Sequence, residues 1–139
     1  MMRVAIVYDS ATGKTKAAAE QMGEVTRAEG NECSLDSIHE ADPAAVAAAD
    51  AICVGSWNKG LYVMRQRPSQ ATSDFIERLA PLDGKQAAVF TTYAIAVGKT
   101  LEKMARPLEA RGAKVTGRFK SKGPSAADDF ATWLRRLNT

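Results

Sequence analysis

The stretch RVAIVYDSATGKTK, residues 3–16, contains the pattern that decides the fold. It begins with the apolar run Arg3 to Tyr8, which has the length of a buried strand and is too short for a helix. A loop rich in Ser, Thr and Gly follows, and Lys14 to Glu29 then has the apolar spacing of an amphipathic helix. The stretch therefore predicts a strand, a hydroxyl-rich loop and a helix in direct succession.

The rest of the chain repeats this alternation. Further strands are predicted at Glu32–Ser37, Ala51–Gly55, Gln86–Thr91 and Lys114–Phe119. Helices are predicted at Ala44–Ala49, Ser73–Leu79 and Gly98–Arg111, and over a C-terminal stripe of Phe130, Trp133, Leu134 and Leu137. Five such units predict an α/β fold of three layers, in which a five-stranded parallel sheet has helices on both faces.

Ligands of such folds bind where the parallel strands end. Three loops follow the first, third and fourth predicted strands, and we expect the site there: Asp9–Thr15, Ser56–Ser69 and Thr92–Gly98.

The first loop ends in Gly13-Lys14-Thr15, as the phosphate loop of ATPases and GTPases does. That loop needs an earlier glycine, but Tyr8 stands in its place, and Tyr93 stands there for the second Gly-Lys-Thr at residues 98–100. The third strand also ends in Ser56 without an acid to bind Mg²⁺. Hydrolysis of a nucleoside triphosphate is therefore excluded.

A shorter loop of this kind can hold a single phosphate. Ser10, Thr12 and Thr15 place hydroxyl groups around a glycine at a helix N-terminus, where free N–H groups and the helix dipole favour an anion. The alternative is an ordinary helix cap rich in Ser and Thr. The loop alone leaves both interpretations open.

The segment Ser10-Ala11-Thr12-Gly13-Lys14-Thr15 resembles the Ser/Thr-x-Thr-Gly-x-Thr phosphate loop of the flavodoxin family. The resemblance extends over the whole chain, in its alternating units and in a length similar to short-chain flavodoxins. It implies one flavodoxin-like domain over residues 1–139, with FMN as cofactor and the FMN phosphate held by residues 10–15.

The other two loops match flavin-ring contacts of that family. Ser56 precedes Trp57, which matches a residue that stacks on the isoalloxazine ring, and Asn58, Lys59 and Gly60 match a turn beside the flavin N5. Thr91 and Thr92 match the loop at the pyrimidine edge, and Tyr93 matches the second stacking position. Trp57 as a core residue, and Tyr93 as a cover for the end of the sheet, are the alternatives.

The resemblance implies an electron carrier that passes one or two electrons through bound flavin. A small NAD(P)H-dependent quinone or flavin reductase and a flavin-free protein-binding module are the alternatives, so whether the protein is an enzyme stays open. A phospho-acceptor receiver domain is disfavoured, because Ser56 stands where its Asp belongs and Asp9 has no acidic neighbour. No Ser-His-Asp, Cys-His or paired-carboxylate arrangement is evident, so no catalytic residue is assigned.

The chain departs from the acidic character of many flavodoxins. Its net charge is +3, and the second loop carries Lys59, Arg65 and Arg67. Cations near the flavin stabilise its anionic, fully reduced form, so we expect a less negative second one-electron step than in acidic relatives. The residues Leu61 to Met64 of this loop either anchor it or form a lid.

A second group of basic residues lies between Gly98 and Gly123, with two acids opposing it. It is either a solvated surface or a docking face for an acidic redox partner. Nucleic acid is disfavoured, because no aromatic strand motif or recognition-helix pattern accompanies the charge.

The remaining features indicate location. Cys33 and Cys53 lie far apart in apolar contexts, which is typical of reduced cytoplasmic thiols. No apolar run approaches the ~20 residues that a membrane span needs, and the N-terminus does not have the pattern of a signal peptide. The single histidine, His39, makes a His/Cys metal site improbable, so no metal is predicted.

Overall fold

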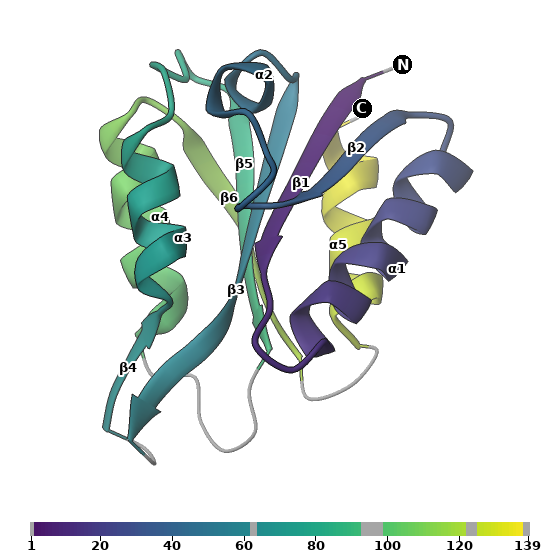
Figure 1. The fold of residues 1–139 in the computed structure, drawn as a ribbon. Coiled ribbons are helices and arrows are strands. Elements are labelled where there is room, and N and C mark those ends of the chain that lie inside the picture. The colour runs from purple at the N-terminus through teal and green to yellow at the C-terminus, as the bar shows by residue number, and fades with distance from the viewer. Residues whose placement is uncertain (1, 62–63, 93–98, 122–124, 138–139) are drawn as a thin grey trace.

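The computed structural model describes residues 2–61, 64–92, 99–121 and 125–137. Side chains at 58–66 and 125–126 are outside this description. Parallel strands form the centre of the molecule and helices cover both faces (Figure 1).

The sheet contains the predicted parallel strands and one additional strand. The parallel strands lie in the order β2-β1-β3-β5-β6, and their bounds are Arg3–Asp9 (β1), Glu32–Ser37 (β2), Ala51–Leu61 (β3), Gln86–Thr92 (β5) and Lys114–Ser121 (β6). The additional strand β4, Met64–Pro68, pairs antiparallel with the end of β3. The prediction of a five-stranded parallel sheet is confirmed, and β4 was missed.

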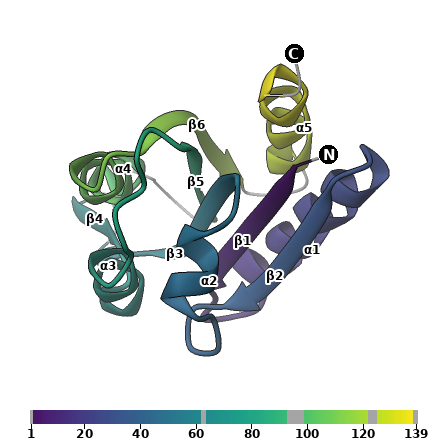
Figure 2. The same ribbon diagram turned by 90° about the horizontal axis from the view of Figure 1, so that it is seen from above.

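The helices divide between the two faces, as Figures 1 and 2 show. One face carries α1 (Lys14–Ala28) and α5 (Ser125–Leu137), and the other carries α2 (Pro43–Ala47), α3 (Gln70–Glu77) and α4 (Thr100–Ala110). This is the predicted three-layer arrangement. In the described part of the chain, no helix is long and apolar enough to cross a membrane.

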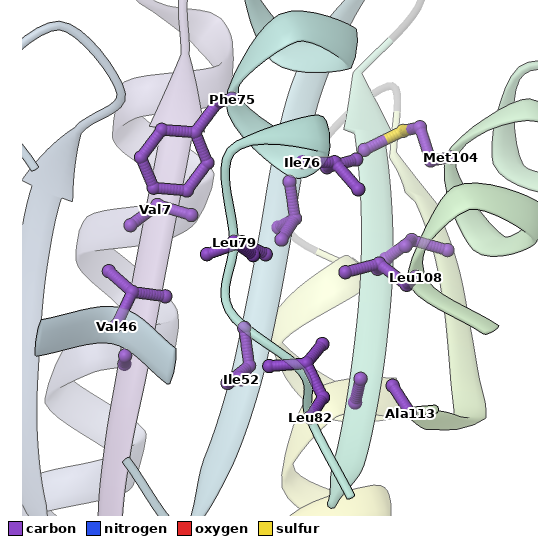
Figure 3. Close-up of a cluster of buried hydrophobic side chains, with 14 of the residues drawn as sticks. Val7, Val46, Ile52, Phe75, Ile76, Leu79, Leu82, Met104, Leu108 and Ala113 are labelled. Atoms are coloured by element: carbon purple, nitrogen blue, oxygen red, sulfur yellow. The ribbon is translucent and has the colours of Figure 1, made fainter. Parts of the chain in front are cut away.

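Each face of the sheet has its own apolar core because strand side chains alternate between faces. In β1, Ala5 and Val7 pack toward α2, α3 and α4, while Val4 and Ile6 pack toward α1 and α5. Figure 3 shows the first core, to which the helices contribute Val46, Phe75, Ile76, Met104 and Leu108, while Leu79 comes from the bend after α3. The second core contains Met22, Phe90, Phe119, Phe130 and Trp133.

Local signals in the sequence set several helix ends. The Asp42 carboxylate accepts from the Ala44 N–H at 3.1 Å and caps α2. Gly30 follows the end of α1 with φ 87°, a backbone conformation that favours glycine. The predicted start of α3 at Ser73 is wrong, because Ser69 caps the helix through its side chain and α3 begins at Gln70.

Candidate functional site

The candidate site lies at the edge of the sheet where the parallel strands end, at the lower end of Figure 1. Asp9 pairs with Ser56, Ser56 pairs with Thr91, and Thr92 pairs with Ser121. All five residues are polar and buried. A buried polar group is costly unless it has a hydrogen-bonding partner, so the partners of these side chains define the site.

The loop between β1 and α1 presents the open end of a helix. Gly13 precedes α1 with φ 91°, and its N–H donates to Ser10 Oγ at 3.0 Å. No side-chain hydrogen bond caps the first residues of α1 in the part of the chain that the structure describes. The Ser10 hydroxyl therefore serves the Gly13 N–H ahead of the helix and does not cap α1 itself. The N–H groups of the first turn lie beside the exposed Thr12 and Lys14, an arrangement suited to an anion.

Thr15 connects this loop to the end of β5. Its hydroxyl lies 2.7 Å from the hydroxyl of Thr92, and both residues are buried. The third hydroxyl of the predicted phosphate loop thus has a protein partner. A hydroxyl has one donor and two acceptor sites, so Thr15 retains capacity for a further bond.

Trp57 lies at the same edge, half-buried, with its indole N–H directed at β1. Trp57 Nε1 donates to Asp9 Oδ2 at 3.2 Å. The indole is therefore held by one edge at the point where β3 leaves the parallel sheet and continues into the hairpin with β4. It belongs to neither core cluster, which contradicts the alternative of a core tryptophan.

Ser69 joins α3 to the same carboxylate, although its place at the end of the predicted loop Ser56–Ser69 came with no predicted role. Its hydroxyl donates to Asp9 Oδ2 at 2.5 Å and accepts from the Thr72 N–H at 3.2 Å as the helix cap. Its own N–H donates to Ser56 Oγ at 2.9 Å. A serine directly after Pro68 and ahead of a helical segment is a helix-start signal that could have identified it.

The interpretation of Asn58, Lys59 and Gly60 as a turn is wrong. These residues continue β3, with Asn58 opposite Pro68 and Lys59 opposite Arg67 in β4, and an irregularity follows Lys59. Pairing with β4 keeps the chain extended here. The predicted loop Ser56–Ser69 therefore contains a β-hairpin, in which Leu61 pairs with Met64.

The remaining predicted residues take several positions. Thr91 is buried, and its hydroxyl donates to the Ser56 carbonyl oxygen at 2.8 Å, so it braces the edge from within. The Ser56 hydroxyl donates to the Trp57 carbonyl oxygen at 2.8 Å. Ala11 is exposed. Tyr93, the second predicted stacking residue, lies outside the described residues.

A family model described as a flavodoxin domain matches residues 5–130. The chain belongs to the flavodoxin domain family. A search of curated protein sequences finds no match.

Solved flavodoxins are similar to this chain over nearly their whole length. A flavodoxin of Megasphaera elsdenii in the two-electron reduced state shares 25% identity, with 92% of this chain and 95% of that chain covered and a TM-score of 0.81. A flavodoxin from the domain Archaea shares 21% identity over 99% of this chain and 100% of that chain, with a TM-score of 0.80. A Fusobacterium nucleatum flavodoxin bound to flavin mononucleotide has a TM-score of 0.74 at 8% identity, with 99% of each chain covered.

His39 lies closer to the site of this flavodoxin domain than its place in the sequence indicates. Its Nε2 is 3.4 Å from Asp9 Oδ1, although the imidazole is 66% exposed. Asp9, His39 and Ser69 are thus neighbours, but the carboxylate lies between the other two. A catalytic triad needs the histidine in the middle to take the serine proton, so this cluster has the wrong order for hydrolysis.

The two thiols lie away from this edge. Burial raises the pKa of the Cys33 thiol, and raises that of the fully buried Cys53 thiol well above its ordinary value. Both cysteines are free. Within the described ranges no group of three or more His, Cys, Asp or Glu side chains could hold a metal ion.

The second basic group of the flavodoxin domain lies on α4, β6 and the residues around them. Part of its charge is opposed: Arg106 lies 3.6 Å from Glu102, and Arg118 lies 3.9 Å from Glu109. Both pairs are exposed, so they contribute little stability. Lys114, Arg118 and Lys120 alternate along the exposed positions of β6, which forms one edge of the parallel sheet. Charges there oppose edge-to-edge association.

Proposed function

We propose that this flavodoxin domain binds FMN and transfers electrons through it to a partner protein. One observation carries the proposal: the uncapped N-terminus of α1 and the indole of Trp57 lie at the same edge of the sheet. A phosphate site and an aromatic ring at one edge suit a ligand with a phosphate at one end and a planar ring at the other.

In this proposal the β1–α1 loop, residues 10–15, holds the FMN phosphate. The N–H groups of the first turn of α1 supply donors, and the hydroxyl of Thr12 is exposed beside them. Lys14 is also exposed and adds a positive charge near the anion. Thr15, held by Thr92, fixes the loop against β5.

Trp57 stacks on the ring in this proposal, and Thr92 at the end of β5 lies at the pyrimidine edge of the flavin. An aromatic side chain provides a large apolar contact of defined geometry. FMN, when bound, supplies the redox chemistry, and the protein supplies binding, orientation and electrostatics.

The hairpin of β3 and β4 is basic, which distinguishes this domain from acidic flavodoxins. Lys59, Arg65 and Arg67 lie on β3 and β4 beside the proposed ring site, with no acid between Trp57 and Pro68. We propose an acidic redox partner, because opposite charges favour encounter. A cytoplasmic location is part of the proposal, in keeping with two free thiols.

The visible spectrum of the purified protein tests the proposed cofactor. We expect a yellow protein, or an apoprotein that quenches FMN fluorescence on titration, and a less negative second reduction step than in acidic flavodoxins. Absence of flavin binding would contradict the proposed function. Bleaching of the flavin by NADH or NADPH alone would instead support a reductase.

The Thr12→Ala variant tests the phosphate loop. Thr12 is exposed, so the substitution leaves the folded core intact. We expect about tenfold weaker binding of FMN, the loss of one hydrogen bond to a charged group, and no change for riboflavin, which lacks the phosphate. Thr132→Ala is the control, because Thr132 is exposed on α5, and it should leave FMN affinity unchanged. Thr116 on β6 is less suitable, because its hydroxyl bonds to Gln86 and Trp133. Equal losses for both ligands would contradict this assignment.

A further inference from the structure

Asp9 is the centre of a hydrogen-bond cluster that neither the phosphate loop nor the ring contact accounts for. Its side chain is 11% exposed. One oxygen, Oδ2, accepts from Ser69 Oγ at 2.5 Å and from Trp57 Nε1 at 3.2 Å. The other, Oδ1, faces His39. A buried carboxylate is costly, so its retention at this edge calls for a role beyond stability.

The positions of the protons in this cluster follow from its acceptors. The Asp9 carboxylate only accepts, so the single hydroxyl proton of Ser69 is committed to it. Thr72 must then donate its own hydroxyl proton to Ser69 Oγ, across 2.7 Å. The Ser69 N–H is bonded to Ser56. The carboxylate orientation is thus set by β1, β3 and α3 together.

The indole of Trp57 receives its orientation from this carboxylate. The bond to Oδ2 holds the N–H edge of the ring, so rotation about the side-chain torsions would break a charge-assisted hydrogen bond. His39 contributes little, since its imidazole is mostly exposed. Among the described residues, Asp9 therefore supplies the hydrogen bond that holds the indole of Trp57.

We propose that Asp9 is a positioning residue that fixes the Trp57 indole for stacking on the flavin ring. This inference rests on the proposed function. It assigns a role to a strand-end carboxylate that itself need not touch the ligand. Substitution of Asp9 should therefore weaken the binding of the flavin ring and leave the binding of the phosphate unchanged. The loss of affinity should require the indole N–H of Trp57.

A double-mutant cycle between Asp9→Ala and Trp57→Phe tests the proposal. The Phe variant keeps an aromatic ring but lacks the N–H donor. We expect Asp9→Ala to weaken FMN and riboflavin equally, by about tenfold, because the ring contact is common to both. In the Trp57→Phe background the same substitution should change affinity less than about twofold. A full tenfold loss in that background would overturn the proposal.

Two further variants keep the test decisive. Asp9→Asn keeps an acceptor for the indole N–H, so it should lose less affinity for FMN and riboflavin than Asp9→Ala does, and an equal loss would contradict the role of this hydrogen bond. Asp50→Asn is the control, since the Asp50 carboxylate also accepts a hydrogen bond, in its case from the Arg3 N–H at 2.8 Å, and lies at the opposite end of the sheet. Its flavin affinity should equal that of the wild type.

A measurement without flavin separates this proposal from the proposed function. In a Trp133→Phe background, Trp57 is the remaining tryptophan. We expect Asp9→Ala to lower the fluorescence anisotropy and the near-ultraviolet circular dichroism of Trp57 in the apoprotein. Unchanged signals would overturn the positioning role even if flavin binds. A wild-type protein that binds neither FMN nor riboflavin would contradict the proposed function. The anisotropy and circular dichroism of Trp57 would still report whether Asp9 holds the indole.

Discussion

The middle of the sheet and its carboxyl edge are both buried, yet they are built from different side chains. The middle consists of apolar residues such as Ile6, Val54 and Val89, while the edge consists of Asp9 and a group of hydroxyl residues: Thr15, Ser56, Ser69, Thr91 and Thr92. Burial of apolar surface stabilises the first region. Hydrogen bonds only offset the cost of burial in the second. The difference indicates that the middle holds the fold together and the edge serves the ligand.

The largest expected effect comes from the middle. Phe90 is fully buried in the core beneath α1 and α5. We expect Phe90→Ala to lower the free energy of unfolding by about 3–5 kcal/mol, from lost burial and the cavity that remains. Urea denaturation measures it. A loss below about 1 kcal/mol would mean that the core collapses around the site, contrary to this prediction.

Gly55 provides an internal check on that result. It pairs with Phe90, and a Cβ there would lie 2.0–2.4 Å from atoms of the Phe90 ring. Gly55→Ala should therefore cost about 1–3 kcal/mol in the wild type. In the Phe90→Ala background the ring is gone and the cost should be smaller. Additive losses would show that the clash with Phe90 is not the cause.

The same contrast explains what could be predicted from the sequence. The apolar runs that form β1, β3 and β5 have a clear length and flanking loops, so the order of elements and the parallel sheet were predictable. The hydroxyl-rich loop before α1 was predictable because Ser10 to Thr15 are contiguous, and its role in holding a phosphate stays a prediction. Strand β4 was not, since the segment 64–68 contains two arginines and a proline, and its pairing depends on the hairpin with β3.

The cluster around Asp9 was beyond reach for a related reason. Ser69 lies 60 residues from Asp9, and Trp57 lies 48 residues away. Nothing in the local sequence of either indicates the other, because the sheet register and the start of α3 bring them together. The sequence did not place His39 near Asp9 for the same reason, and the exposed His39 side chain lies 3.4 Å from the Asp9 carboxylate.

The next prediction concerns the hydroxyl pair that Thr15 and Thr92 form at the edge. Thr15→Val or Thr92→Val alone leaves the other buried hydroxyl without its partner, which should cost about 1–3 kcal/mol of unfolding free energy. The double variant removes both hydroxyls and should be close to the wild type in stability. Thermal or urea denaturation of the three variants measures this. If the double variant lost as much unfolding free energy as the two single variants together, the hydroxyl pair would not be the cause, and the contrast between the two regions would fail here.

The smallest effect is expected away from both regions, at Cys33. Cys33 pairs with Val4, roughly 16 Å along β1 from Asp9 at the usual strand rise. Burial raises the pKa of its thiol, so little thiolate is present at neutral pH and alkylation by iodoacetamide should be slow. The rate should increase with pH, since the thiolate is the reacting form. Cys53 should react only after unfolding, because its side chain is fully buried.

Alkylation of Cys33 should leave FMN affinity unchanged, since the modified atom lies far from the carboxyl edge. A modified protein with weakened FMN binding would show that the amino half of the sheet also supports the ligand, and that the two regions are not as separate as their side chains indicate.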